Sequence, residues 1–387
     1  MEEEKKSISV SDYSVVFLIG PAFSGKSTFA NRHFAEHEIV REGKIDYTKT
    51  LQVLDGTYLE ADSRKEILRN AKAQNYQRVA ILFEAELEEL MARNRVRSVS
   101  KGYLEMQIRT MYTMQKRLRE EGFEQIYAVS VKDADAFEVR RTKGSWDLRE
   151  DKGPFDIIGD VHGCYDALSK LVRKLGYTRN EEGNYVHKEG RKIIFCGDVV
   201  DRGDQSVAVL KLIMKLEKDG VARMVMGNHD DRLLRYLKGN DLEEIHGLET
   251  TAEEMRQEDD AFREEVLHFL ERQPAYLWLD GGSLVVAHAG IKRAFLGKDT
   301  KAIREYCLYG ALKREYDSLG FPSIEEWAAD YEDDCMAVFG HIPASRVYKI
   351  HNTYGVDTAC VFGYYLSALR YPEMSVEQVK NRIRKKK

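Results

Sequence analysis

The chain has 387 residues, of which 43% are hydrophobic, so that two or three domains could each bury a core. Its 60 basic residues nearly balance 65 acidic ones, and a net charge of −5 neither requires nor excludes a nucleic-acid partner. No apolar run reaches the length of a membrane span or of a signal peptide. The five cysteines are odd in number, scattered and without a CxxC spacing, which favours a reducing compartment. We therefore expect a cytoplasmic protein without a membrane partner.

The first motif follows an apolar stretch, residues 13–19, which predicts a strand. The next eight residues, GPAFSGKS, match the pattern GxxxxGK[ST], and a helical pattern begins at Ser27. Backbone N–H groups of such a loop surround phosphate, while the lysine reaches the outer phosphates and the hydroxyl ligates Mg²⁺. The sequence therefore predicts an ATP and Mg²⁺ site formed by Gly20, Ser24, Gly25, Lys26, Ser27 and Thr28.

The rest of the first half alternates predicted strands and helices, which favours an α/β fold. Strands are expected at 51–55, 78–84 and 123–131, and helices at 63–73, 87–119 and 133–140. Asp55 ends a strand and is suited to hold Mg²⁺ through water. Arginines of the long helix can act as a lid over a triphosphate, and Arg97 and Arg109 are the candidates. The charged segment 147–154 is the predicted linker between domains 1–146 and 155–387.

The second half contains five blocks of similar pattern. In each block a short apolar run is followed by polar residues, which are aspartate, asparagine or histidine, with a glycine beside them. Polar groups at strand ends can converge on one point, as a metal site requires. A single block would indicate only a turn, but five in order favour metal. The blocks are FDIIGDVHG (155–163), IIFCGDVVDRG (193–203), MVMGNHD (224–230), VVAHAG (285–290) and VFGH (338–341).

The chemistry of these side chains indicates the kind of metal. A set of Asp, Asn and His ligands without cysteine suits Mn, Fe or Zn better than Ca or Mg. Two such ions clamp a phosphate group and turn a bridging water into hydroxide. In residues 232–276, apolar side chains recur at helical spacing. This pattern predicts a helical insertion that packs on the core.

Taken together, the five blocks resemble the signature of the calcineurin-like binuclear metallophosphoesterases. The resemblance implies an α/β/β/α sandwich with two divalent metals, preferably Mn²⁺, with Fe, Ni or Zn as alternatives. It also implies that Asp201 orients His229 as the general acid and that Arg202 neutralises phosphate charge. The implied ligands are Asp160, His162 and Asp198 for the first metal, and Asp198, Asn228, His288 and His341 for the second.

A phosphate loop joined by DKGPFDIIGDVHGC to this signature resembles the bacterial polynucleotide kinase-phosphatases, here without their ligase domain. Further matching stretches are REEGFEQIY (119–127), VDTACVFG (356–363) and LSALRYPE (366–373). The resemblance implies RNA end healing: phosphorylation of a 5′-OH, and removal of a 3′-phosphate or 2′,3′-cyclic phosphate. It also implies RNA rather than DNA ends as partners, a separate ligase, and Asp357 near the metals.

The kinase half departs from that family between the first helix and Asp55, where the segment is short. The family carries a general-base aspartate there, and Asp46 is the carboxylate that remains for this role. Loss of a general base commonly slows a reaction by about 10²–10⁴-fold. We therefore expect a kinase that is weak, altered in acceptor, or inactive.

Three other functions stay open at this stage. A symmetrical dinucleoside polyphosphate hydrolase would use the same metal ligands, and a Ser/Thr protein phosphatase shares GDVVDRG and GNHD. In a third, non-enzymatic role, the phosphate loop would be a regulatory nucleotide-binding module that controls the phosphatase. The sequence determines neither the native metal nor the oligomeric state, and a dimer remains open.

Overall fold

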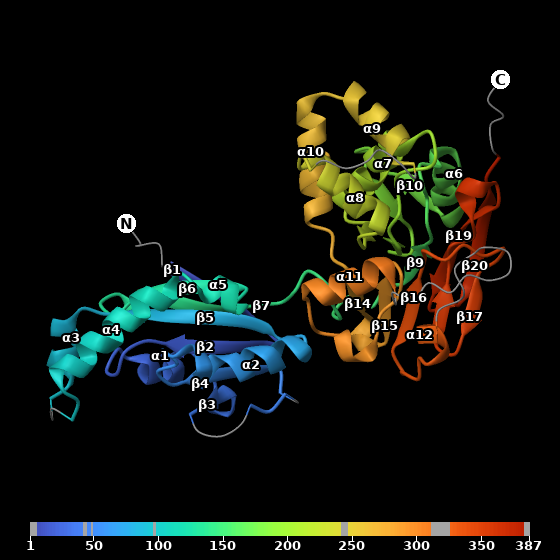
Figure 1. Ribbon diagram of the computed structural model, residues 1–387. Coiled ribbons are helices and arrows are strands. Elements are labelled where there is room, and N and C mark those ends of the chain that lie inside the picture. Colours follow the sequence, from blue (N-terminus) through green and yellow to red (C-terminus); the bar gives the residue numbers. More distant parts are fainter. Residues whose placement is uncertain are drawn as a thin grey trace. The chain divides into compact units, whose positions relative to one another are not determined.

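The computed structural model describes residues 6–41, 45–47, 49–95, 98–240, 247–310 and 326–382. The chain divides into two compact units, the first formed by Met1–Gly144 with Gly297–Thr300 and the second by Ser145–Leu296 with Lys301–Lys387. Each unit has its own sheets and helices (Figure 1). No helix in the described part of the chain is both long and apolar enough to cross a membrane.

The first unit is built on a parallel sheet with the strand order β3-β4-β2-β5-β6. Its strands are β2 (Ser14–Ile19), β3 (Ile39–Val40), β4 (Leu51–Asp55), β5 (Gln77–Glu84) and β6 (Gln125–Ser130). Its helices are α1 (Lys26–His33), α2 (Ala61–Ala73), α3 (Leu87–Arg93), α4 (Lys101–Gln115) and α5 (Leu118–Glu121), with a 3₁₀ turn η1 (Glu36–Glu38).

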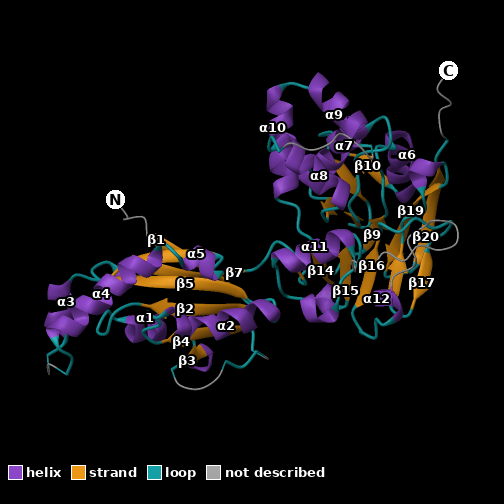
Figure 2. Ribbon diagram, viewed as in Figure 1, coloured by secondary structure: helices purple, strands orange, loops and turns teal. Residues whose placement is uncertain are grey.

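Both faces of this sheet are buried, which explains why β2 reads as a continuous apolar run rather than an alternating one. Val16 and Leu18 pack with Phe29 of α1 on one face. Val15 and Phe17 pack on the other face in the cluster that includes residues of α2. The helices therefore enclose the sheet as outer layers, as Figure 2 shows.

Two helix predictions in this unit are wrong. The stretch 87–119 forms three helices rather than one, and α4 begins anew where the Ser100 hydroxyl accepts the N–H of Tyr103. The expected helix 133–140 is a 3₁₀ turn, η2 (Ala134–Ala136), followed by strand β7 (Phe137–Thr142). Strand β1 (Lys6–Ser11), which the sequence did not reveal, pairs with β7 in parallel and supplies the backbone partners that favour a strand.

The second unit contains two sheets, with the orders β13-β12-β9-β19-β20 and β17-β18-β16-β15-β14-β8. The first comprises β9 (Phe155–Ile158), β12 (Lys192–Phe195), β13 (Ala222–Met224), β19 (Tyr365–Tyr371) and β20 (Ser375–Lys380). The second comprises β8 (Asp147–Leu148), β14 (Tyr276–Leu279), β15 (Leu284–Ala287), β16 (Met336–Phe339), β17 (Tyr348–Ile350) and β18 (Thr353–Gly355). A small hairpin adds β10 (Tyr177–Arg179) and β11 (Tyr185–His187).

Helices cover the outer face of each sheet, so the four layers are α/β/β/α as expected. Those beside the first sheet are α6 (Tyr165–Leu175), α7 (Ser206–Lys218), α8 (Asn228–Leu237), α9 (Leu248–Gln257) and α10 (Asp260–Glu271). Those beside the second are α11 (Lys301–Tyr309) and α12 (Glu326–Ala329). Helices α8 to α10 confirm the predicted helical insertion.

Side-chain alternation along the strands explains the two-sheet core. In β12, Ile194 faces the opposite sheet, whereas Ile193 and Phe195 face the helices. In β15, Val286 faces the inter-sheet core, whereas Val285 packs with the outer helices. Each short apolar run is therefore buried on both sides.

The segment 147–154, expected as a linker, belongs to the second unit, and its first two residues form strand β8. Strand β8 pairs in parallel with β14, and Trp278 donates its backbone N–H to the carbonyl of Trp146. Asp151 accepts a hydrogen bond from the Lys192 ammonium. The charged residues that suggested a linker thus make specific contacts within the second unit.

A buried ion network holds the end of β9 to β19. Asp156 is fully buried and accepts hydrogen bonds from Arg191 at 3.0 Å, Arg370 at 3.0 Å and the Tyr177 hydroxyl at 2.9 Å. Arg191, only 1% exposed, also bonds the Phe155 carbonyl at 2.7 Å. The network thus pairs the buried carboxylate of Asp156 with the positive charges of Arg191 and Arg370.

Replacing Arg191 should leave Asp156 with a buried charge that is less well compensated. We expect Arg191→Met to destabilise the second unit by about 3–5 kcal/mol, measured as a lower urea midpoint. Arg179→Met, which removes an exposed arginine from β10, is the matched control and should leave the midpoint unchanged. Equal midpoints for both variants would contradict the assigned role of the network.

Candidate metal centre

The strand ends bring the polar blocks together. Strands β9, β12 and β13 are parallel and in register at Ile158, Phe195 and Met224, so the loops after them meet at one sheet edge. In the other sheet, β15 and β16 are parallel and end side by side. These five loops carry the predicted site residues Asp160, His162, Asp198, Asp201, Arg202, Asn228, His229, His288 and His341.

The loops hold several site residues in a backbone conformation that non-glycine residues rarely adopt. Positive φ angles between 45° and 70° occur at His162, Asp198, Asp201, Arg202 and His341. Each costs of order 1–3 kcal/mol and persists only where the surrounding structure determines it. Such residues concentrate at functional sites, in agreement with the predicted assignment.

Glycines in these motifs permit close approach rather than merely ending strands. A Cβ at Gly340 would lie 2.0 Å from Asp160 Oδ1, and one at Gly227 would lie 2.3 Å from Asp198 Oδ1. Neither contact is sterically allowed, so the carboxylates can occupy these places only beside glycine.

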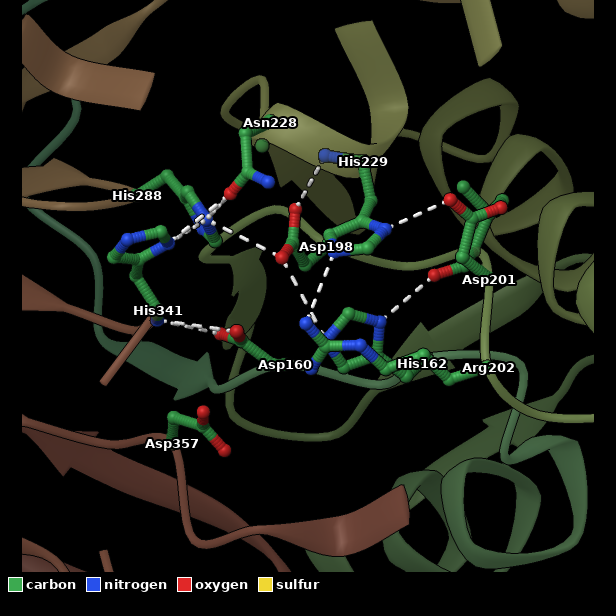
Figure 3. A network of polar contacts seen from close by, with 12 residues as sticks. Asp160, His162, Asp198, Asp201, Arg202, Asn228, His229, His288, His341 and Asp357 are labelled. Atoms are coloured by element: carbon green, nitrogen blue, oxygen red, sulfur yellow. Dashed lines mark hydrogen bonds and ion pairs between the residues drawn. The ribbon is translucent and has the colours of Figure 1, made fainter. Parts of the chain in front are cut away.

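Four donor atoms form one compact group. His288 Nε2 lies 2.9 Å from Asn228 Oδ1, 3.1 Å from His341 Nδ1 and 3.4 Å from Asp198 Oδ2. Asn228 Oδ1 lies 3.0 Å from His341 Nδ1. Ligands about 2.0–2.2 Å from a tetrahedral metal are separated by roughly 3.3–3.6 Å, close to these spacings. This is the ligand set predicted for the second metal, and Figure 3 shows it on one side of Asp198.

Asp198 lies between two groups of imidazoles. Its Oδ2 is 3.4 Å from His288 Nε2 and 3.6 Å from His162 Nε2, while its Oδ1 accepts the backbone N–H of His229 at 2.9 Å. One carboxylate oxygen therefore faces both groups, an arrangement that lets Asp198 bridge two metals. The donor atoms of His162, Asp198 and His229 lie within 4.8 Å of one another, as do those of Asp198, His288 and His341.

The imidazoles are oriented by backbone carbonyls. His162 Nδ1 lies 2.9 Å from the Val200 carbonyl, and His288 Nδ1 lies 2.9 Å from the Cys196 carbonyl. Each Nδ1 therefore carries its proton and turns Nε2 toward the centre, which is how proteins orient metal-binding histidines.

His229 and Arg202 lie together on the side of His162. His229 Nδ1 bonds Asp201 Oδ2 at 2.7 Å, so its Nε2 faces the site. The Arg202 guanidinium donates to His162 Nε2 at 3.0 Å and to His229 Nε2 at 3.1 Å. This places a fixed positive charge where a phosphate oxygen would be recognised. The geometry suits His229 as a proton donor oriented by Asp201.

Asp160 and Asp357 lie beside the donor groups rather than within them. Both oxygens of Asp160 lie 3.1 Å from the backbone N of His341, whereas Asp357 accepts the N–H of Ala359 at 2.9 Å. Burial and the neighbouring Asp357 raise the pKa of Asp160 well above its usual value. Burial also raises the pKa of Asp357 to about 6. Both residues remain predicted ligands of the centre.

The charges of the site favour a cation. Burial lowers the pKa of His162 and of His341 to about 3, so both imidazoles are neutral at ordinary pH. Burial also acts to lower the pKa of His288, but Asp198 outweighs it and raises that pKa to about 10. The buried carboxylates thus attract positive charge to the position where the donors converge. The residues present fit divalent metal ions, and a bound ion would replace the proton that Asp198 favours on His288.

Asp230 is a functional residue that sequence reasoning missed. Its carboxylate accepts the backbone N–H groups of Asp198 at 2.8 Å, Val199 at 3.0 Å and Gly227 at 3.0 Å. It thereby fixes the loops that carry the bridging Asp198 and Asn228. The signal available was its position directly after GNH, where a carboxylate at the start of α8 can also cap the helix.

In the first unit, the loop after β2 encloses the lysine of its motif. Lys26 Nζ donates to the carbonyls of Gly20 at 2.9 Å and Pro21 at 2.7 Å. Gly25 has a φ of 87°, and α1 begins directly after it. The Ser27 hydroxyl donates to Asp55 Oδ1 at 3.1 Å. Burial lowers the pKa of Lys26 to about 8.

A cavity of about 530 Å³ lies over this loop and includes residues 23–29, Arg32 and Arg93. Arg93 donates to the Phe23 carbonyl at 3.4 Å. The predicted lid residue Arg109 is instead in a separate cavity of about 510 Å³ with Arg64 and Arg117. Within the described residues, Arg93 contacts the loop, whereas the lid role of Arg109 stays a prediction. Arg97 lies outside the described residues.

The predicted kinase base is wrong. Asp46 precedes β4, and its backbone N–H bonds Gln52 near the start of that strand. Because β4 and β2 are parallel, this is the opposite sheet edge from the phosphate loop, which follows the end of β2. The sequence-based assignment of Asp46 did not take into account that the chain returns to the start of β4 before that strand begins.

Metal content provides a direct test of the bridging role. With Mn²⁺ supplied, we expect two ions per wild-type chain, one for His341→Ala, and loss of both for Asp198→Ala, measured by elemental analysis after gel filtration. Asp201→Asn, which changes the partner of His229 but no predicted ligand, should keep both ions. Two retained ions in Asp198→Ala would contradict the bridging geometry.

Comparison with known proteins agrees with this geometry. The model of the calcineurin-like phosphoesterase family matches residues 153–368. The chain is similar to a bis(5′-nucleosyl)-tetraphosphatase PrpE [asymmetrical] of Bacillus velezensis, 43% identical over 231 residues, covering 59% of this chain and 92% of the relative. The protein of the same name from Bacillus subtilis is 42% identical over 229 residues, covering 58% and 93%.

Among solved structures, a putative diadenosine tetraphosphatase is 24% identical with a TM-score of 0.46, covering 62% of this chain and 98% of that one. The family match spans more than half of the chain and contains the donor groups that converge on Asp198. The chain therefore belongs to the calcineurin-like phosphoesterase family, whose members use a binuclear divalent metal centre, and it is a metallophosphoesterase.

Proposed function

We propose that the second unit hydrolyses dinucleoside tetraphosphates asymmetrically, giving a nucleoside triphosphate and a nucleoside monophosphate. The observation that carries this proposal is the identity of 42–43% with relatives of that name, over 92–93% of their length. The sequence left a symmetrical hydrolase and a Ser/Thr protein phosphatase open as alternatives to RNA repair, and the names of the relatives favour asymmetrical cleavage instead.

The residues of the centre support such a reaction. When bound, two metal ions supply a hydroxide nucleophile and neutralise phosphate charge. The Arg202 guanidinium, 3.0–3.1 Å from two imidazoles of the site, is placed to hold a phosphate oxygen. His229 presents Nε2 to the leaving group while Asp201 fixes its orientation.

The acidity of the leaving group separates this function from RNA end healing. A nucleotide phosphate is a good leaving group without protonation, whereas a ribose hydroxyl needs a proton from a general acid. We expect His229→Asn to slow removal of an RNA 3′-phosphate by about 10²–10⁴-fold and cleavage of a dinucleoside tetraphosphate much less. The two rates are measured on one preparation, and an equal loss on both substrates would contradict His229 as the general acid.

Product analysis tests the proposal itself. Diadenosine tetraphosphate is incubated with the protein and Mn²⁺, and the nucleotides are separated by ion-exchange chromatography. ATP and AMP in equal amounts are expected, whereas ADP alone would indicate symmetrical cleavage. Absence of cleavage, together with phosphate release from an RNA 3′-phosphate or a phosphopeptide, would overturn the proposal in favour of those substrates. Asp198→Ala is the inactive control.

RNA end healing is the second candidate, because the first unit carries a phosphate-loop geometry outside the family match. Lys26 lies within the loop, Ser27 contacts Asp55, and a cavity of about 530 Å³ adjoins them. We propose that this unit binds a nucleoside triphosphate with Mg²⁺, and either phosphorylates an RNA 5′-OH or regulates the phosphoesterase. A separate ligase would then complete the repair.

Labelled ATP distinguishes these roles. The protein is incubated with γ-labelled ATP, Mg²⁺ and an RNA with a 5′-OH and a 3′-phosphate. Label on the RNA that is lost in Lys26→Ala but kept in Asp46→Asn would establish a kinase, since Asp46 lies at the opposite sheet edge. ATP binding without transfer, and with an altered phosphoesterase rate, would instead support the regulatory role.

A further inference from the structure

An exposed aromatic ring lies next to the arginine of the metal centre. Phe362 is 53% exposed, and the Arg202 guanidinium carbon lies 5.9 Å from the centre of its ring. The same guanidinium bonds His162 and His229. A single side chain therefore separates Phe362 from the imidazoles at which phosphate chemistry occurs.

The loop that carries Phe362 is held firmly at its base. The Thr358 hydroxyl donates to the Tyr365 carbonyl at 2.6 Å, and the Tyr365 N–H donates to the Thr358 carbonyl at 3.2 Å. Asp357, beside the metal centre, accepts the Ala359 N–H, and Ala359 in turn accepts the Phe362 N–H at 3.0 Å. The exposed ring thus lies within a closed loop that begins directly after the predicted metal ligand.

A cavity beside this loop offers space for more than a phosphate group. It measures about 250 Å³, and its lining includes Gly163, Arg202, Gln205, Thr250, Val361 and Asn381. Arg202 is itself exposed, so a ligand can reach the guanidinium from solvent. The lining also includes the carboxylates of Asp166 and Asp204 and a second arginine, Arg382. A cavity with so many polar groups suits a polar heterocycle better than a hydrocarbon chain.

A single exposed phenylalanine is ordinary on a protein surface, and exposure alone would carry no conclusion. Two further observations distinguish Phe362: its cation–π contact with the phosphate-binding arginine, and its closed connection to Asp357. In a nucleotide, phosphate and base are separated by one ribose, so a phosphate at Arg202 brings the base into reach of the ring. Nucleobases stack on aromatic rings with little dependence on base identity.

We propose that Phe362 is a stacking platform for a nucleobase of the substrate, with the cavity beside Arg202 receiving the nucleoside. This inference rests on the proposed function in that it names the nucleoside-binding part of the same site. It predicts that the enzyme distinguishes nucleotides from phosphate compounds without a base, and that it tolerates different bases.

The test compares AMP with ribose 5-phosphate, which has the same sugar and phosphate but no base. Both are used as competitive inhibitors of p-nitrophenyl phosphate hydrolysis in Mn²⁺. We expect wild-type protein to bind AMP more tightly, and Phe362→Leu to raise the inhibition constant of AMP roughly 10-fold while leaving that of ribose 5-phosphate unchanged. Phe362→Trp should retain tight AMP binding, because it keeps an aromatic face.

Tyr364→Leu is the matched control, since Tyr364 is 51% exposed on the same loop but Arg202 contacts Phe362 instead. The control should leave both inhibition constants unchanged. Equal binding of the two inhibitors by wild-type protein, or a Phe362→Leu effect on both alike, would overturn the inference. Because the reporter is a simple phosphate ester, failure to cleave dinucleoside tetraphosphate would count against the proposed function alone.

Discussion

The structure of the second unit depends on keeping several carboxylates and imidazoles buried at one point. Asp198 is the centre of this arrangement, with one oxygen facing both His162 and His288. Buried charge is costly unless it is compensated, and here backbone N–H groups, Arg202 and the predicted metals share the compensation. Asp230 adds a further buried carboxylate, whose three backbone hydrogen bonds fix the loops around Asp198.

This constraint explains the layered fold around the site. Short, doubly buried strands end at one edge and give the loops rigid starting points. The loops then turn sharply, with positive φ angles at His162 and Asp198. The packing of the two sheets offsets the energetic cost of this backbone strain. Glycine at 227 and 340 lets neighbouring carboxylates approach the backbone closely. Rigidity of the two-sheet core is therefore what allows a strained and highly charged centre.

The proposed phosphate sites of the two units would be built differently. In the second, side chains from two sheets surround the reacting group, and Phe362 extends the site toward the nucleoside. In the first, a loop and the start of α1 provide backbone N–H groups, with Lys26 and Asp55 nearby.

The sequence alone determined the metal-ligand types, the short strands before them and the motif of the phosphate loop. Those features are local, since an apolar run followed by glycine and a carboxylate carries its meaning within ten residues. It also indicated the sandwich, through a family resemblance that the domain match confirms.

The tertiary structure decided which elements pair and which side chains meet. Strand β7 replaced a predicted helix because the distant β1 lies beside it. Asp46 lies at the sheet edge opposite the phosphate loop because β4 runs parallel to β2. Such contacts join residues far apart in the chain, and no local pattern records them.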